Sequence, residues 1–114
     1  MTSSCDFDVI VVGAGPAGSM AAYHLAKKNF NVMIVDQQEF PRYKPCGGGL
    51  PERTLKEIPF DLSPVLDFSA AGGIVTYRGQ PRLKVPLTGN YAWLAMRDSL
   101  DQYLFFDFFG KNLA

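Results

Sequence analysis

The spacing of apolar positions predicts a strand, a helix and a second strand at the start of the chain. Phe7–Val12 and Val32–Asp36 are short runs rich in valine and isoleucine. We interpret them as parallel strands buried on both faces, because such strands need not alternate. Between them, Ala17–Lys28 places alanines and a leucine at helical spacing, with Asn29 as a stop. The unit has the length of about 30 residues that a right-handed βαβ crossover requires.

The pattern then changes to a loop followed by antiparallel strands. Residues 40–51 are rich in proline and glycine and predict a loop. Further on, Leu83 and Val85 alternate with polar residues, which predicts a strand with one wet face, and Pro86 places it at a sheet edge. The elements expected after the loop are a short helix at Arg53–Ile58, strands at Ile74–Arg78 and Arg82–Leu87 around a turn at Gly79–Pro81, a strand at Tyr91–Ala95 and a helix at Asp98–Phe109.

A glycine motif lies between the first strand and the first helix. Residues 13–18, Gly-Ala-Gly-Pro-Ala-Gly, match G-x-G-x-x-G in the context that the motif requires. Gly13 permits a sharp turn off the strand, Gly15 lets a phosphate approach the backbone, and Gly18 lets the helix pack closely. The N–H groups of the first helical turn then face a pyrophosphate. The predicted pyrophosphate site comprises Gly13, Gly15, Pro16, Ala17 and Gly18.

Asp36 completes this dinucleotide fingerprint at the end of the second strand. A carboxylate there accepts hydrogen bonds from an adenosine ribose and repels a 2′-phosphate. The residues therefore favour FAD or NAD over NADP. They do not separate FAD from NAD, because both present the same ADP half.

The segment Lys44–Leu50 reads Lys-Pro-Cys-Gly-Gly-Gly-Leu. Three consecutive glycines are entropically costly, which indicates a backbone that approaches a flat or bulky ligand. A flexible linker is the alternative, but Pro45 and Cys46 are not typical of linkers. We interpret the segment as a ligand-contacting loop.

Together, Asp8–Asp36 and Lys44–Leu50 resemble the N-terminus of the geranylgeranyl reductase family. Arg97–Asp101, Arg-Asp-Ser-Leu-Asp, is similar to the Arg-x-x-(Phe/Leu)-Asp segment of that family. These proteins are FAD-dependent oxidoreductases with a fold like that of p-hydroxybenzoate hydroxylase. They reduce isolated double bonds of isoprenoid chains, with NAD(P)H or another reductant as the electron source. The resemblance covers about residues 6–104.

The resemblance also implies roles for particular side chains. Arg97 would reach the cofactor from its helix start, with a solvated surface charge as the alternative. Cys46 would lie beside the flavin as a candidate catalytic residue, with an inert loop residue as the alternative. Trp93 would either line an apolar substrate cavity or pack the sheet. The implied residues on the flavin side are Lys44, Cys46, Gly47, Gly48, Gly49 and Arg97, beside the ribose contact Asp36.

The expected fold class is α/β, namely an incomplete Rossmann-like FAD-binding βαβ unit with an appended antiparallel β segment and a C-terminal helix. In this interpretation residues 1–114 form the N-terminal portion of an FAD-binding domain. Its expected parts are the dinucleotide unit 6–36, the flavin-side loop 40–51, antiparallel strands at 72–96 and a helix at 97–109.

Composition narrows the classes of partner and compartment. The formal net charge is zero, so no global basic field favours nucleic acid. Cys5 and Cys46 have neither metal-ligand nor disulfide-framework spacing, which fits a cytoplasmic protein. The uncharged stretch Val9–Ala26 is interrupted by glycines and is a poor membrane span. Contact with a membrane surface follows from the resemblance alone, because prenyl substrates partition into lipid.

The end of the chain departs from the family resemblance. Residues 105–109 contain four phenylalanines in five positions, which does not suit a surface helix. We expect a truncated, inactive product, and the alternative is a small domain that buries these rings in a partner. The predicted function is therefore the FAD-binding portion of a flavin-dependent reductase that saturates isoprenoid double bonds. The alternatives are an FAD-dependent aromatic hydroxylase of the same fold and a non-catalytic nucleotide-binding remnant.

Overall fold

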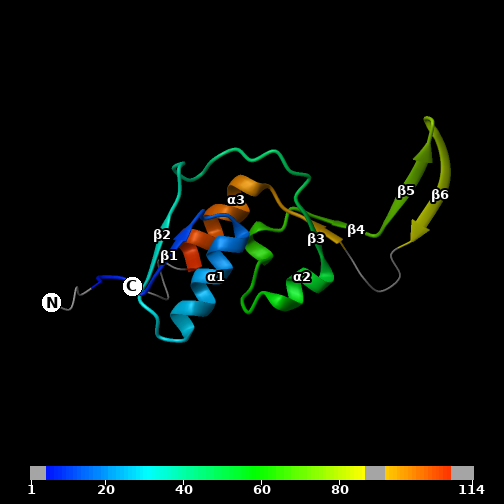
Figure 1. Cartoon of the computed structure of the whole chain (residues 1–114). Helices are drawn as coiled ribbons and strands as arrows, with labels where there is room; N and C mark the ends of the chain where they lie inside the picture. Colours follow the sequence, from blue (N-terminus) through cyan, green and yellow to red (C-terminus); the bar gives the residue numbers. More distant parts are fainter. Residues whose placement is uncertain (1–4, 87–91, 109–114) are drawn as a thin grey trace. The chain divides into compact units, whose positions relative to one another are not determined.

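The computed structural model describes residues 5–86 and 92–108 (Figure 1). The chain divides into two compact units, residues 1–43 with 98–114 and residues 44–97. The first unit contains the βαβ unit and the C-terminal helix, and the second contains antiparallel strands. The expected α/β class is confirmed at this level.

In the first unit, β1 (Val9–Val12) and β2 (Val32–Val35) pair in parallel, and α1 (Pro16–Lys27) contacts both (Figure 1). Both strands alternate between half-buried and exposed residues, and Ile10 and Val12 are 60% and 82% exposed. The expectation that both faces are covered is therefore wrong for the described residues. The reason is that α1 covers one face, where Val11 lies beside the helix, while Ile10 and Val12 lie on the other.

The ends of α1 follow local chemistry. The helix begins at Pro16, one residue before the expected start, because proline suits the first helical position. Asn29 has a φ of 66°, and its N–H donates to the Ala26 carbonyl at 2.9 Å. The Phe30 N–H donates to the Leu25 carbonyl at 3.2 Å. These bonds form a Schellman motif, so the stop expected at Asn29 is confirmed.

The C-terminal helix consists of two different parts. It begins as α3 (Arg97–Gln102) and continues as the π-helical segment η2 (Tyr103–Phe108). Leu100 and Leu104 are fully buried, and η2 contacts α1. The Phe105 ring stacks on Phe40 with ring centroids 5.7 Å apart. The predicted last residue, Phe109, lies outside the described residues.

The second unit contains a three-stranded antiparallel sheet in the order β3-β7-β4. Its elements are β3 (Gly49–Pro51), α2 (Glu52–Glu57), the 3₁₀ turn η1 (Ser63–Val65), β4 (Phe68–Ala70) and β7 (Ala92–Leu94). Trp93 lies opposite Leu50 on one side and Ser69 on the other. The prediction of loop throughout residues 40–51 is wrong at its end, because Gly49–Pro51 pairs with β7. β4 was not predicted.

A separate antiparallel hairpin joins β5 (Gly72–Tyr77) to β6 (Gln80–Pro86). Its turn is Arg78-Gly79, with φ values of 51° and 73°, as a type I′ turn requires. The turn expected at Gly79–Pro81 is wrong, because Gln80 already pairs with Tyr77. Every residue of both strands is exposed, so water reaches both faces rather than one.

Candidate functional site

The glycine turn follows β1 and is tied to β2. The Gly13 N–H donates to the Val35 carbonyl at 2.7 Å, and Gly13 has a φ of 101°, where side chains are strained. A Cβ at Gly18 would clash with the Gly13 carbonyl oxygen, well inside 3.0 Å, and would lie 3.3 Å from Val11 Cγ1. The first turn of α1 therefore lies directly against the strand and the glycine turn.

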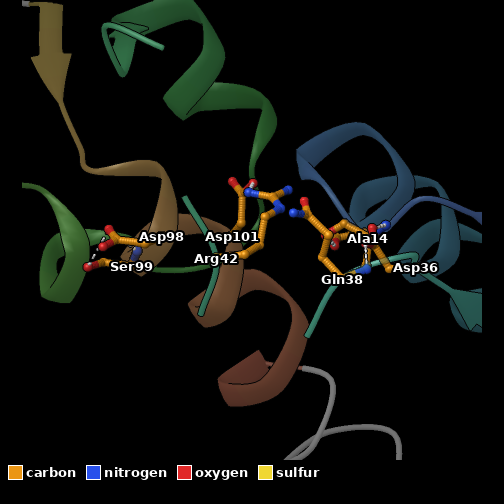
Figure 2. Close-up of polar contacts among 8 residues, drawn as sticks. Ala14, Asp36, Gln38, Arg42, Asp98, Ser99 and Asp101 are labelled. Carbon is orange, nitrogen blue, oxygen red and sulfur yellow. Dashed lines mark hydrogen bonds and ion pairs between the residues drawn. The ribbon is translucent and has the colours of Figure 1, made fainter. Parts of the chain in front are cut away.

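Two side chains hold the two peptide groups that flank the Cα atom of Ala14. The Ala14 N–H donates to Asp36 Oδ2 at 2.7 Å, and the Ser19 hydroxyl donates to the Ala14 carbonyl at 3.1 Å. Ala14 and Ser19 have no exposed surface. Figure 2 shows Asp36 reaching Ala14 from the end of β2. These two hydrogen bonds fix the backbone of the turn.

The carboxylate of Asp36 is held in its ionised form. The Ala14 N–H on one oxygen, followed by the Gln38 N–H on the other at 2.9 Å, lowers the pKa of Asp36 below its ordinary value of 3.8. The nearby positive charge of Arg42 lowers this pKa further. Each carboxylate oxygen has a second lone pair, and Asp36 is exposed. It can still accept a hydrogen bond from a ribose hydroxyl.

The N-terminus of α1 is suited to an anion. Gly15 caps it with extended backbone and no side-chain hydrogen bond, Pro16 follows, and the first turn contains no acidic residue. The helix dipole and the N–H groups of that turn favour negative charge. His24 and Lys27 lie in the last turn, where cations are favourable. The residues present therefore fit a pyrophosphate.

A buried ion pair joins the segment after β2 to α3. Arg42 Nη1 lies 2.7 Å from Asp101 Oδ2, with 9% and 0% of the two side chains exposed (Figure 2). The Arg42 guanidinium also lies 4.7 Å from the centroid of the Phe40 ring. The sequence analysis did not predict this pair, although Asp101 is the last residue of the Arg-x-x-Leu-Asp segment.

The glycine segment of the second unit has its own packing constraints. Gly48 has a φ of 66°, and a Cβ there would clash with the Ala95 carbonyl oxygen. The Gly48 carbonyl accepts the Ala95 N–H at 3.0 Å, and the Gly48 N–H lies 3.4 Å from Cys46 Sγ. A Cβ at Gly47 or Gly49 would meet nothing within 4 Å. The close approach of Ala95 therefore explains why residue 48 is a glycine. It does not explain Gly47 and Gly49, which have open space beside them.

The predicted site residues fall into two groups. The glycine turn and Asp36 lie together in the first unit. Lys44, Cys46 and the three glycines belong to the second unit, where Lys44 and Cys46 are exposed. Arg97 is half-buried at the start of α3, at the boundary between the units.

A second feature of the second unit is a hollow of about 330 Å³ beside Trp93, lined by apolar residues together with Asp61 and Ser63. Trp93 also pairs with both neighbouring strands, so it packs in the sheet and lines this hollow. The apolar residues around the hollow are Leu55, Phe60, Leu62, Leu66 and Trp93.

Sequence reasoning missed Ser19 as well as the Arg42–Asp101 pair. A signal for Ser19 was available, because it shares one face of α1 with the buried Ala22 at i, i+3 spacing. A hydroxyl on an apolar helix face needs a partner when buried. The Ala14 carbonyl, five residues earlier in the glycine turn, provides it.

The part of the chain that contains the glycine turn and Asp36 is similar to known proteins. Residues 8–44 match the family described as FAD dependent oxidoreductase. The menaquinone reductase of Mycobacterium tuberculosis is 53% identical over 51 residues, 45% of this chain and 12% of that protein. The geranylgeranyl diphosphate reductase of Rhodobacter capsulatus is 28% identical over 98 residues, 86% of this chain and 24% of that protein.

A solved structure extends the likeness to the fold. A flavoprotein/dehydrogenase from Cytophaga hutchinsonii is 31% identical, with a TM-score of 0.69 over 86% of this chain and 26% of that one. The chain thus spans about a quarter, or less, of these proteins. Together the comparisons show that this chain is similar to FAD-dependent oxidoreductases.

One further finding concerns membranes. Within residues 5–86 and 92–108, no helix combines the length and apolar character needed to cross a bilayer.

Proposed function

We propose that this chain binds the ADP half of FAD at the glycine turn and the N-terminus of α1. The observation that supports this most strongly is the backbone of Ala14, whose N–H is held by Asp36 and whose carbonyl is held by Ser19. These bonds fix the backbone next to an uncapped helix start without an acidic first turn. A site arranged in advance in this way saves the ordering cost that a flexible glycine turn would add to binding.

In this proposal the turn holds the pyrophosphate and Asp36 accepts a hydrogen bond from the ribose. Since Pro16 has no N–H, the backbone donors of the first turn are those around it. The proposed pyrophosphate residues are Gly13, Gly15, Pro16, Ala17 and Gly18. Because Asp36 is ionised and exposed, a 2′-phosphate in its place would be repelled.

The flavin half is assigned to the second group of residues. Lys44, Cys46, Gly47, Gly48, Gly49 and Arg97 are proposed to line it. The support is the open space at Gly47 and Gly49 and the family resemblance of the segment. Cys46 is the candidate catalytic residue, since its side chain is exposed.

We propose further that the protein is part of a flavin-dependent reductase acting on isoprenoid double bonds. FAD supplies hydride transfer when it is bound, and NAD(P)H is the proposed electron donor. The support is the likeness to a geranylgeranyl diphosphate reductase over most of the chain and the largely apolar hollow beside Trp93. A prenyl substrate would also bring the protein to a membrane surface.

A second candidate substrate is a quinone. It is favoured by the 53% identity to a menaquinone reductase. The two reactions differ in product, because saturating a prenyl double bond adds two hydrogens to the chain, whereas reducing a quinone adds them to the ring oxygens. Mass and absorbance spectra of products made by the FAD-loaded protein with dithionite distinguish them, provided that the quinol formed without protein is subtracted, because dithionite reduces quinones directly.

The cofactor is tested by titrating FAD and following the quenching of flavin fluorescence. Gly15→Val should abolish binding, because its side chain fills the space that the phosphates need. Gly73→Val is the matched control, since a Cβ at Gly73 meets nothing within 4 Å. Unchanged FAD affinity in a folded Gly15→Val variant would refute the assignment. Tighter binding of NADP than of NAD would refute the role of Asp36.

A further inference from the structure

The hollow beside Trp93 has two different kinds of lining. Its apolar part is formed by buried and half-buried side chains from α2, from β7 and from the segment around η1, namely Leu55, Trp93, Phe60, Leu62 and Leu66. Its other part consists of Asp61 and Ser63, which are exposed and which we call the polar edge. The hollow therefore combines an apolar interior with a polar edge that water reaches.

Local hydrogen bonds hold the polar edge in place. The Ser63 N–H donates to Asp61 Oδ1 at 2.9 Å, and the Ser63 hydroxyl donates to Asp61 Oδ2 at 2.6 Å. The Val65 N–H donates to the Leu62 carbonyl at 2.9 Å, which closes the 3₁₀ turn. The two bonds from Ser63 lower the pKa of Asp61 below its ordinary value of 3.8, so this carboxylate is ionised at neutral pH.

The charge at the polar edge is negative. Among the lining residues that the structure describes, Asp61 is the one charged side chain. The basic side chains of α2, Arg53 and Lys56, line a separate hollow. Lys56 Nζ also lies 3.1 Å from Glu52 Oε1 on the same helix. A ligand that enters the hollow beside Trp93 therefore meets a carboxylate, and no cation occurs among the described lining residues.

We propose that the hollow binds part of an isoprenoid whose polar end is an uncharged hydroxyl group, and that Asp61 selects against a prenyl diphosphate. This inference rests on the isoprenoid function proposed above and specifies the head group of the substrate. The apolar interior takes the chain, because burying apolar surface is favourable. The hydroxyl donates a hydrogen bond to the Asp61 carboxylate, whose oxygens each have more than one lone pair.

Charge and size both bear on this choice of ligand. A diphosphate at the polar edge would place like charges side by side, which weakens binding. A hydroxyl gains a charge-assisted hydrogen bond there instead. The volume of about 330 Å³ lies at the lower end of the range for small-molecule pockets, about 300–1,000 Å³. It suits a short isoprenoid or one end of a longer chain.

The chain contains its own reporter for this hollow, because Trp93 is its only tryptophan. The test is titration of the full chain, without FAD, with geraniol and with geranyl diphosphate, each followed by the fluorescence of Trp93. Geraniol should shift the emission of Trp93 to shorter wavelength as it displaces water from the hollow. It should bind roughly tenfold more tightly than geranyl diphosphate at low salt, the scale of repulsion between exposed charges. This preference should shrink at high salt, because the charges are then screened.

Two variants separate the charge of Asp61 from the shape of the hollow. Asp61→Asn removes the charge and keeps an oxygen that can accept the Ser63 N–H. It should tighten the binding of geranyl diphosphate roughly tenfold and weaken that of geraniol about fivefold, because the hydrogen bond is no longer charge-assisted. Glu57→Gln is the matched control, since it removes the same charge from an exposed position on α2 outside this hollow. It should leave both affinities unchanged.

Circular dichroism establishes that each variant is folded. Equal or tighter binding of geranyl diphosphate by the wild-type chain, or an unchanged preference in Asp61→Asn, would overturn the role of Asp61 and leave isoprenoid binding standing. No response of Trp93 to either compound would overturn the assignment of the hollow itself. Because no flavin is present, FAD binding can fail without affecting these results.

Discussion

Replacing Gly18 by alanine should separate α1 from the glycine turn. The added Cβ would overlap the Gly13 carbonyl oxygen and would press on Val11 Cγ1 at 3.3 Å. The obstructing group is the carbonyl of the Gly13–Ala14 peptide, which is held by the bond from the Ala14 N–H to Asp36 Oδ2. A backbone carbonyl cannot move aside by a rotamer change, so the helix has to shift.

Two opposing contributions determine the magnitude. Alanine is favoured over glycine within a helix by about 1 kcal/mol. Overpacking costs about 1–3 kcal/mol, and the upper end applies because the clash is with backbone. We therefore expect Gly18→Ala to lower the free energy of unfolding by about 1–2 kcal/mol. FAD affinity should fall as well, because the first turn of α1 moves with the helix.

The assay is urea denaturation followed by far-UV circular dichroism, together with FAD titration of each folded variant. Gly73→Ala is the matched control, because its Cβ meets nothing within 4 Å and its φ is not positive. Gly13→Ala isolates backbone strain, since its Cβ is also in open space but its φ is 101°. If Gly18→Ala is as stable as the wild type and binds FAD equally well, the reasoning is wrong.

Three other changes test the contacts around the turn. Asp101→Asn should lower the free energy of unfolding by about 3 kcal/mol or more, because it leaves the charge of Arg42 buried without its partner. Replacing both Arg42 and Asp101 by apolar residues should cost less in the same denaturation assay. Ser19→Ala should lower the free energy of unfolding by about 1–3 kcal/mol, because it leaves the Ala14 carbonyl without its hydrogen bond. Ser19→Thr keeps the hydroxyl and is the comparison; equal stability of the two variants would contradict this reasoning. The folded-state pKa of Asp36 is lowered, so its bonds stabilise the fold above about pH 4 and are lost as the pH falls through that pKa. Asp36→Asn should therefore flatten the dependence of the urea midpoint on pH in the acid range, and identical slopes would refute it.

Local chemistry made the βαβ unit predictable. The valine-rich runs, the proline at the start of α1 and Asn29 at its end each act within a few residues. The exposure of Ile10 was not predictable in the same way. An apolar strand pattern does not specify whether one face or two are covered, because this depends on which other segments pack there.

The second unit shows the same limit more strongly. Gly49–Pro51 has little intrinsic strand character, since glycine and proline are both depleted in strands. It forms β3 only because β7, more than forty residues later, supplies the partner for Leu50. The hairpin turn could have been predicted, because Arg78-Gly79 leaves Tyr77 and Gln80 as a pair with glycine in the second turn position.

In the candidate site, the sequence pattern identified side chains that could meet a ligand but not those that hold the turn in place. The glycine motif and Asp36 were found because their spacing is tied to the chemistry of a pyrophosphate and a ribose. Asp36 also anchors the Ala14 N–H, and this role depends on distance in space rather than spacing in sequence. The same carboxylate thus links the shape of the turn to its charge. Ser19 holds the carbonyl of the same residue but lies buried, so variants of Ser19 and Asp36 separate the effect of shape from the effect of charge. A change at Ser19 alters only the shape of the turn, whereas a change at Asp36 alters both its shape and its affinity for a ribose.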